Sequence, residues 1–194
     1  IYTLSLHDAL PILSANVDAG FSIVTYTGDG AAATVGHGLS KAPEMVIAKH
    51  NEVTGDYDWP IYHHKNTAAP ETDYIILNGN DGTADNAGIW NDTAPTADVF
   101  TIGDADMINK DDIGYVAYCF HSVDGYSKMG SYVGNHDADG VFVYTGFRPA
   151  WLMIKNAGAT NNWLIVDTVR ETFNPAANAY LFADTSGAEV TDAD

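Results

Sequence analysis

Oxygen-bearing side chains alternate in one short stretch of the chain. Asn135, Asp137 and Asp139 occupy every second position, and Gly140 follows them. Calcium loops begin in this way, because the ion is held by carboxylate and amide oxygens along a turn that a glycine permits. Gly146 stands where such a loop would carry its closing acid. Two interpretations stay open: a partial calcium site, and a solvated turn whose side chains bind nearby backbone amides.

A tryptophan followed by two polar residues suggests a second kind of chemistry. Sugar-binding surfaces stack an aromatic ring on the sugar and bind its hydroxyls with neighbouring polar groups. Trp90, Asn91 and Asp92 have this composition and lie in a Gly/Asp/Asn/Thr-rich loop, which predicts an exposed ligand-binding site. The same composition recurs at Asp58-Trp59 and at Asn161-Asn162-Trp163. Those two tryptophans stand at equivalent positions of an internal repeat, which favours a core role for them.

Side chains typical of catalysis do not form a recognisable set. Cys119 lies in the apolar run YVAYCF, whereas a reactive thiol needs an electropositive, partly exposed setting, so we expect it to be buried. His63 and His64 are adjacent, and neighbours on a strand point to opposite faces, which argues against one shared metal ion. The sequence has no nucleophile elbow, phosphate loop or dinucleotide fingerprint. We therefore expect a protein that is not an enzyme and that needs no cofactor, calcium being the one alternative.

A long internal repeat organises the elements that carry these residues. The stretch 21–49 aligns with a stretch that ends at residue 155, and four residue pairs have the same separation: Tyr26 with Tyr132, Gly28 with Gly134, Pro43 with Pro149, and Lys49 with Lys155. Further along, Trp59 aligns with Trp163 and Tyr74 with Tyr180. A fixed long period predicts two copies of one structural unit, residues 13–125 and 126–194. The second copy lacks counterparts of DVFTI and IGYVAYCFH, so we expect it to be truncated.

Short alternating or apolar runs separated by turn residues indicate strands rather than helices. The expected strands are 21–27, 33–37, 44–49, 59–62, 73–77, 98–102, 113–121, 128–133, 140–145, 150–156, 163–168 and 180–183. Residues 169–173 are expected to form a single helical turn. This pattern predicts an all-β fold, an antiparallel β-sandwich resembling a jelly roll.

The charge balance excludes one class of partner. The chain has 8 Lys and Arg against 26 Asp and Glu, a net charge of −18. Such a surface repels phosphate, so we expect no nucleic-acid binding. The single cysteine forms no internal disulfide, and no apolar run is long enough to cross a bilayer, so no membrane insertion is expected.

The first residues differ in character from the rest. Residues 1–12, IYTLSLHDALPI, are similar to the translation of a common short-read sequencing adapter. A signal peptide would have a basic start and an unbroken apolar stretch, and this segment has neither. We therefore exclude residues 1–12 from the fold and expect the remainder to be a fragment of a longer reading frame.

The remaining chain resembles one protein family over nearly its whole length. The motifs GFSIVTYTGDG, WNDTAPTADVFTIG, YVAYCFHSVDGYSKMGSYVGN and DGVFVYTGFRPAWLMIK resemble an uncharacterised, repeated β-domain family of predicted tail and virion proteins of marine tailed phages. The resemblance supplies no catalytic residues. It implies an extracellular setting on a virion, in a tail fibre or appendage.

These observations together give the expected function. We expect a non-catalytic structural or adhesion module of a phage virion, whose partners are other virion proteins or copies of itself and host-surface polysaccharide. The loops around Trp90 and Asp137 would present the contacts. The alternative is a carbohydrate-binding module of a secreted bacterial hydrolase.

Overall fold

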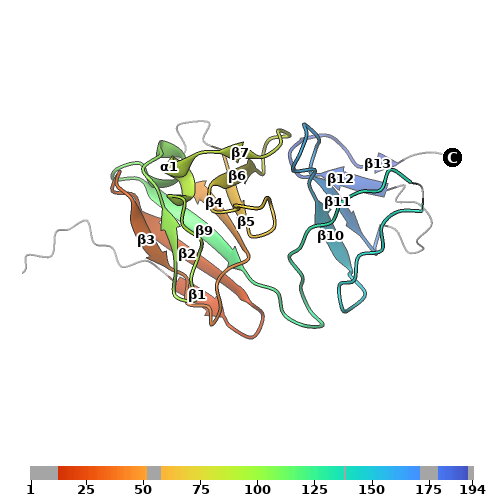
Figure 1. Cartoon of the computed structure of the whole chain (residues 1–194), viewed down its shortest axis with the longest axis horizontal. Coiled ribbons are helices and arrows are strands. Elements are labelled where there is room, and N and C mark those ends of the chain that lie inside the picture. The colour runs from red at the N-terminus through yellow and green to blue at the C-terminus, as the bar shows by residue number, and fades with distance from the viewer. Residues whose placement is uncertain (1–12, 52–57, 138, 171–178, 192–194) are drawn as a thin grey trace, which may run out of the picture.

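The computed structural model describes residues 13–51, 58–137, 139–170 and 179–191. The adapter-like segment 1–12 lies outside the described residues. Figure 1 shows two β-rich parts next to each other, a larger first part that holds β1–β9 and a smaller second part that holds β10–β13. The described strands pair antiparallel throughout, and the expected all-β sandwich class is confirmed.

A seven-stranded sheet forms the frame of the first part, in the order β1-β2-β9-β4-β5-β6-β7. Its strands are β1 (Leu13–Asn16), β2 (Phe21–Thr27), β4 (Met45–His50), β5 (Pro60–His63), β6 (Asp73–Ile76), β7 (Ala84–Asp85) and β9 (Gly114–Phe120). The last of these to be synthesised, β9, lies between β2 and β4 and pairs with both along its length.

Alternation along β2 and β9 explains why one face of this sheet becomes the core. The register places Val24 opposite Ala117 and Tyr26 opposite Tyr115, and all four side chains are buried. The residues between them point to the other face, because successive strand residues alternate. The Tyr26 and Tyr115 rings stack with centroids 5.1 Å apart.

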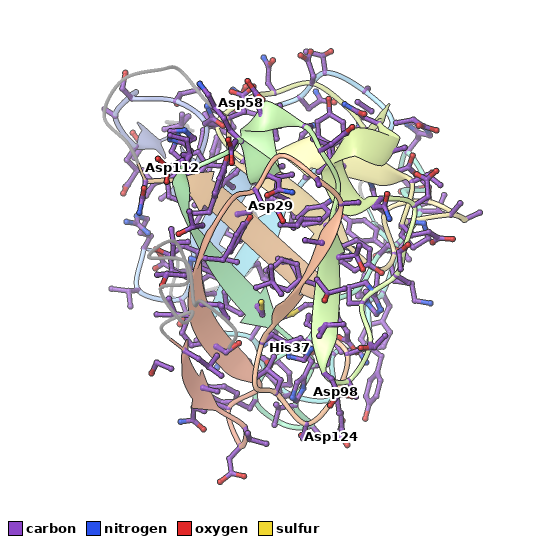
Figure 2. The ribbon with its side chains drawn as sticks, turned by 90° about the vertical axis from the view of Figure 1, so that its left-hand side faces the viewer. Asp29, His37, Asp58, Asp98, Asp112 and Asp124 are labelled. Atoms are coloured by element: carbon purple, nitrogen blue, oxygen red, sulfur yellow. The ribbon has the colours of Figure 1, made fainter. Side chains whose placement is uncertain are left out.

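A second layer covers this face and completes the sandwich. It consists of the two-stranded sheet β3 (Ala33–Gly36) and β8 (Val99–Ile102), with two one-turn helices, α1 (Ala87–Trp90) and α2 (Asp106–Asn109). Figure 2 shows this layer in front of the large sheet, with side chains filling the space between them. The core contains buried residues from both layers, among them Val46, Tyr62, Ile89, Trp90, Phe100, Ile102 and Ile108.

Asn109 joins the turn after β2 to the second layer. Its side-chain amide donates hydrogen bonds to the carbonyl oxygens of Ala31 (2.5 Å) and Gly103 (2.8 Å), and its Oδ1 accepts one from the Asp29 amide (3.0 Å). Next to this point Gly28 has no room for a side chain, because a Cβ there would lie 2.2 Å from the carbonyl oxygen of Lys110. The residue at position 28 must therefore be glycine for the chain to pass this close.

The second part is a four-stranded sheet that reproduces half of the first. Its strands are β10 (Trp151–Ile154), β11 (Leu164–Asp167), β12 (Ala179–Phe182) and β13 (Val190–Thr191), in chain order. The registers agree pair by pair with those of β4–β7: Met45↔His63 recurs as Trp151↔Asp167, Ile61↔Ile75 as Ile165↔Leu181, and Tyr74↔Ala84 as Tyr180↔Val190. Descent of the two parts from one duplicated unit stays a prediction.

Trp163 fastens the second sheet to the outer face of the first. Its ring is 5% exposed and packs with Ile47, Ile61 and Ile75, and its indole N–H donates a 2.8 Å hydrogen bond to the Ile76 carbonyl. The Lys155 ammonium adds a polar contact by donating to the Asn80 carbonyl (3.2 Å). The second layer therefore covers one face of the large sheet, and the second part covers the other face at β4, β5 and β6.

Several expected elements differ from the structure. Residues 128–133 and 140–145 form no strand, although their alternation is typical of one, because a strand also needs a partner for its backbone groups. The segment 13–16 pairs with β2, and the helices α1 and α2 were not expected; four residues are too few to show a helical period. The expected helical turn at 169–173 extends beyond the described residues.

Within the described part of the chain, no helix has the length and apolar character that a membrane crossing requires.

Candidate functional site

The expected site at Trp90 is divided between the core and the surface. Asn86 caps α1 by accepting the Gly88 amide (2.9 Å), and the helix turns the Trp90 ring inward, where it is 2% exposed and meets Tyr62 edge-on at 6.0 Å. Asn91 and Asp92 stay exposed. The prediction that Trp90 is a surface residue is therefore wrong. The Trp90 ring is therefore not available beside Asn91 and Asp92 for a sugar to stack on.

The alternating residues around Asp137 bind the backbone of their own turn. Asn135 Oδ1 accepts the Asp137 amide (3.2 Å), and Asp137 Oδ1 accepts the Asp139 amide (3.0 Å). The Asn135 side-chain amide donates to the Asp139 carbonyl (3.1 Å). All three residues are exposed, and these contacts are those of a solvated turn. Calcium binding there stays a prediction.

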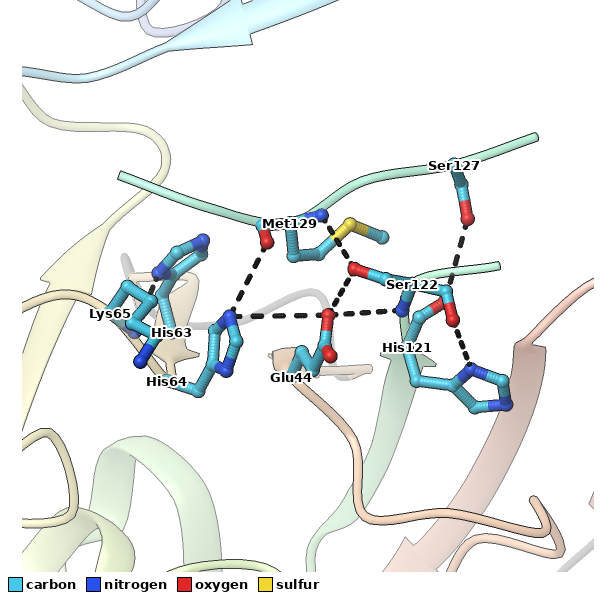
Figure 3. A network of polar contacts seen from close by, with 8 residues as sticks. All are labelled: Glu44, His63, His64, Lys65, His121, Ser122, Ser127 and Met129. Atoms are coloured by element: carbon cyan, nitrogen blue, oxygen red, sulfur yellow. Dashed lines mark hydrogen bonds and ion pairs between the residues drawn. The ribbon is translucent and has the colours of Figure 1, made fainter. Parts of the chain in front are cut away.

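A polar network ties the beginning of the second part to the first sheet (Figure 3). The Ser122 hydroxyl and amide both donate to Glu44 Oε2, the amide at 3.0 Å, and the same hydroxyl accepts the Met129 amide at 3.0 Å. On the other side of Glu44, His64 Nε2 lies 3.9 Å from Oε2 and 3.4 Å from the Met129 carbonyl. The network thus joins the residue before β4, the residue after β5 and the segment after β9.

The order of groups in this network differs from that of a Ser-His-Asp triad. A serine nucleophile hands its proton to a histidine that a carboxylate orients. Here the Ser122 hydroxyl donates its hydrogen bond to the Glu44 carboxylate. His64 contacts that carboxylate and not the hydroxyl. We assign the network a positioning role: it fixes the path of residues 121–129 as they leave the first sheet.

His37 and Cys119 are structural groups. His37 is buried, its Nδ1 accepts the Leu39 amide (3.1 Å), its Nε2 lies 3.2 Å from the Thr96 carbonyl, and burial lowers its pKa (Figure 2). Cys119 is fully buried as predicted, and burial raises the pKa of its thiol to about 12, so it stays protonated. Among the described residues, no three His, Cys, Asp or Glu side chains gather as metal ligands would.

His63 is expected to make the stability of the first part depend on pH. Burial, and then the neighbouring His64, lower its pKa from 6.5 to about 4, and its Nδ1 accepts the Lys65 amide (3.1 Å), a contact that requires the unprotonated ring nitrogen. The unfolded chain therefore takes up this proton first as the pH falls. Stability present above about pH 6.5 should be lost towards pH 4, at no more than about 1.4 kcal/mol per pH unit.

The matched variant for this prediction is His63→Asn, whose side-chain oxygen can accept the same backbone amide but does not titrate. Urea unfolding between pH 4 and pH 7 should show a steeper loss of stability in the unchanged protein than in the variant. A difference between the two proteins that stays constant with pH would contradict the role of His63.

A shallow depression of about 420 Å³ on the second sheet has the composition that the sequence suggested for sugar binding. Its lining residues are Asn161, Asn162, Leu164, Tyr180 and Phe182. The Tyr180 and Phe182 rings, at alternate positions of β12, lie on one face with centroids 5.4 Å apart, nearly perpendicular to each other. Leu164 is the cross-strand partner of Phe182, which brings the asparagines before β11 to these rings.

The aromatic rings of this depression do not come from the tryptophan next to its asparagines. The run Asn161-Asn162-Trp163 had the composition of a sugar site, but its place in the repeat favoured a core role for Trp163. That role is confirmed, since strand alternation turns Trp163 to the opposite face, against the first sheet. The rings come instead from β12, where alternation of Tyr180 and Phe182 was the available signal. In the first sheet the equivalent Tyr74 packs against the core under the second layer, whereas the face at Tyr180 is open.

The chain belongs to the DUF7483 family, described as a domain of unknown function, and the match spans residues 10–194. No curated protein and no solved structure matches it. The family match therefore extends over all three sheets, the Glu44 network and the depression on β11 and β12.

Proposed function

We propose that this DUF7483 domain is a non-catalytic structural and adhesion module of a phage virion, part of a tail fibre or appendage, which contacts host-surface glycan. The observation that carries the adhesion is the depression on the second sheet, where two asparagines border two aromatic rings. A side-chain amide can both donate hydrogen bonds to sugar hydroxyls and accept them. The rings offer apolar faces to the sugar carbons.

The chemistry of the remaining groups supports a non-catalytic role. Ser122 donates to the Glu44 carboxylate rather than to a histidine, and the Cys119 thiol is both buried and protonated. The virion setting rests on the resemblance of the long motifs to phage tail and virion proteins. The net charge of −18 supports a partner without phosphate groups.

The docking of the second sheet supports display of this surface. Trp163 fixes the inner face of β11 to the first sheet, so that Tyr180 and Phe182 are held on the outer face. A contact surface on a rigid sheet loses less conformational entropy on binding than one on a mobile loop. We therefore place the glycan contact on the outer face of β11 and β12 rather than at Trp90 or Asp137.

A glycan array that contains both bacterial surface polysaccharides and plant or algal polysaccharides tests this proposal. The full chain should bind surface polysaccharides, and Asn162→Ala should weaken binding about tenfold, the loss expected when one hydrogen-bonding group is removed. Asp92→Gly is the matched control, because glycine suits the positive φ of 46° at this exposed position of the earlier candidate loop.

Each outcome assigns the function differently. Equal binding by the two variants would remove the depression as the glycan site. Binding confined to plant or algal polysaccharides would favour the second candidate, a carbohydrate-binding module of a secreted bacterial hydrolase, for which the same depression is the supporting observation. Binding to neither group would contradict adhesion.

A further inference from the structure

His37 joins two loops at one end of the first part. The loop 37–44 connects β3 to β4, and the loop 91–98 connects α1 to β8. The His37 ring is 0% exposed, its Nδ1 accepts the Leu39 amide (3.1 Å), and its Nε2 lies 3.2 Å from the Thr96 carbonyl. The ring therefore holds both loops through their backbone groups.

These two contacts require the uncharged ring in one tautomer. A ring nitrogen that accepts an amide N–H carries no proton, so the single ring proton is on Nε2, which donates it to the Thr96 carbonyl. A second proton would have to bind at Nδ1. Its N–H would then face the N–H of Leu39, and a buried charge would have lost a hydrogen bond without gaining another.

Two ionisable groups act on the ring from neighbouring elements. Asp98, directly before β8, lies at the same end of the sandwich as His37 and favours the charged ring (Figure 2), whereas His121, directly after β9, disfavours it. Burial is the strongest influence and outweighs both Asp98 and the Thr96 carbonyl, so the pKa of His37 lies below its usual value of 6.5. The ring therefore takes up a proton more readily when water reaches it than when the sandwich is closed.

The loop after His37 covers apolar side chains. Leu39 is 6% exposed and belongs to the sandwich core. Gly38 has a positive φ of 66° and lies so close to β1 that a Cβ there would be 2.6 Å from the Leu13 side chain. Neither Gly38 nor Leu39 belongs to a strand, so this loop can move away without breaking a strand pair of the large sheet.

We propose that protonation of His37 releases residues 38–43 from this end of the sandwich, so that the first part opens locally in mild acid. The buried ring cannot keep both a charge and the Leu39 contact, and opening brings water to both. This pH-sensitive switch is separate from the effect expected of His63, which lies in β5 and influences global unfolding. It is also independent of the proposed glycan contact on β11 and β12, and either can be absent without the other.

Hydrogen–deuterium exchange of the full chain between pH 5 and pH 7, corrected for the intrinsic exchange rates, measures this opening. Protection of residues 38–43 should be present above about pH 6.5 and fall about tenfold by pH 5, because the opened His37 titrates near its usual pKa and the closed one at lower pH. At pH 5 the peptides of β9 should stay at least tenfold better protected than residues 38–43, as local opening requires.

His37→Asn removes the titration and keeps the backbone contact, because an asparagine oxygen can accept the amide two residues further along the chain. His136→Asn is the matched control, because His136 is exposed and asparagine suits its positive φ of 55°. We expect the pH dependence of residues 38–43 to persist in His136→Asn and to shrink below about threefold in His37→Asn.

Asp98→Asn provides a second variant that leaves the His37 contacts in place, because Asp98 is exposed and meets His37 through its backbone carbonyl (3.3 Å). It should enlarge the loss of protection at pH 5, since the Asp98 carboxylate helps the closed ring to accept its proton.

Equal pH dependence in His37→Asn and the unchanged protein would overturn the proposed switch. So would protection of residues 38–43 that does not change with pH, or that falls in parallel with that of β9, because the opening would then be absent or global. A smaller loss of protection in Asp98→Asn than in the unchanged protein would contradict the assignment to the His37 ring.

Discussion

Replacement of Trp163 by alanine should lower the free energy of unfolding by about 3–5 kcal/mol, the usual cost of removing a buried tryptophan side chain. The ring fills the space between the second sheet and the isoleucines of β4, β5 and β6, and its N–H satisfies the Ile76 carbonyl. The variant should therefore lose both apolar burial and a buried hydrogen bond. Urea unfolding followed by circular dichroism measures the loss.

The two sheets should also separate in this variant, which limited proteolysis detects as faster cleavage between residues 123 and 150. Trp151→Ala is the matched control, because Trp151 is 54% exposed and its removal should change stability by no more than about 0.5 kcal/mol. Trp163→Phe should fall between these two variants, since it keeps an aromatic ring but loses the hydrogen bond. Equal stabilities of the alanine variants would refute the docking role of Trp163.

Trp90→Ala is expected to have a similarly large effect, again about 3–5 kcal/mol, although the sequence places Trp90 in a polar loop. The ring is part of the sandwich core and contacts Tyr62 across the two layers. Thermal and urea unfolding measure the effect. Asp92→Gly, two residues along the chain, should alter stability by no more than about 0.5 kcal/mol.

Trp90→Phe separates packing from polarity at this position. The indole N–H of Trp90 is buried and has no hydrogen-bond partner in the described part of the chain, so phenylalanine removes an unsatisfied donor along with some volume. Its cost should be clearly smaller than that of alanine. If Trp90→Ala left stability unchanged but abolished glycan binding, Trp90 would be a ligand-binding residue and the packing role would be wrong.

The alternation of residue types predicted most of the strands, because successive residues of a strand lie on opposite faces of the sheet. In β9, Tyr115, Ala117 and Cys119 face the core, and the alternating pattern of YVAYCF reports this directly. The β-rich class and the buried thiol follow from the same pattern. The sequence of a strand does not say which other strands it pairs with. The central position of β9 between β2 and β4 could therefore not be derived.

Two predictions failed for the same physical reason: the strand at 140–145 and the surface position of Trp90. The stretch 140–145 has a strand-forming sequence, but pairing depends on a partner that alternation does not specify. Trp90 is buried because a single helical turn, started by Asn86, rotates it inward, and four residues cannot reveal such a turn by period. The asparagines of the depression were recognisable from composition, whereas their union with Tyr180 and Phe182 required the register of β11 and β12.

The place of β9 also affects how the chain acquires its structure during synthesis. Phe21 pairs with Phe120, so β2 and β4 remain without their shared neighbour until the ribosome has released residue 120. Such distant contacts slow folding, and exposed strand edges are open to wrong pairings in the meantime. Residues 1–120 contain 17 Asp and Glu against 4 Lys and Arg, and this acidity offers protection during the interval, because chains that repel one another are slow to aggregate. The acidity of this protein would then serve the nascent chain as much as the finished one.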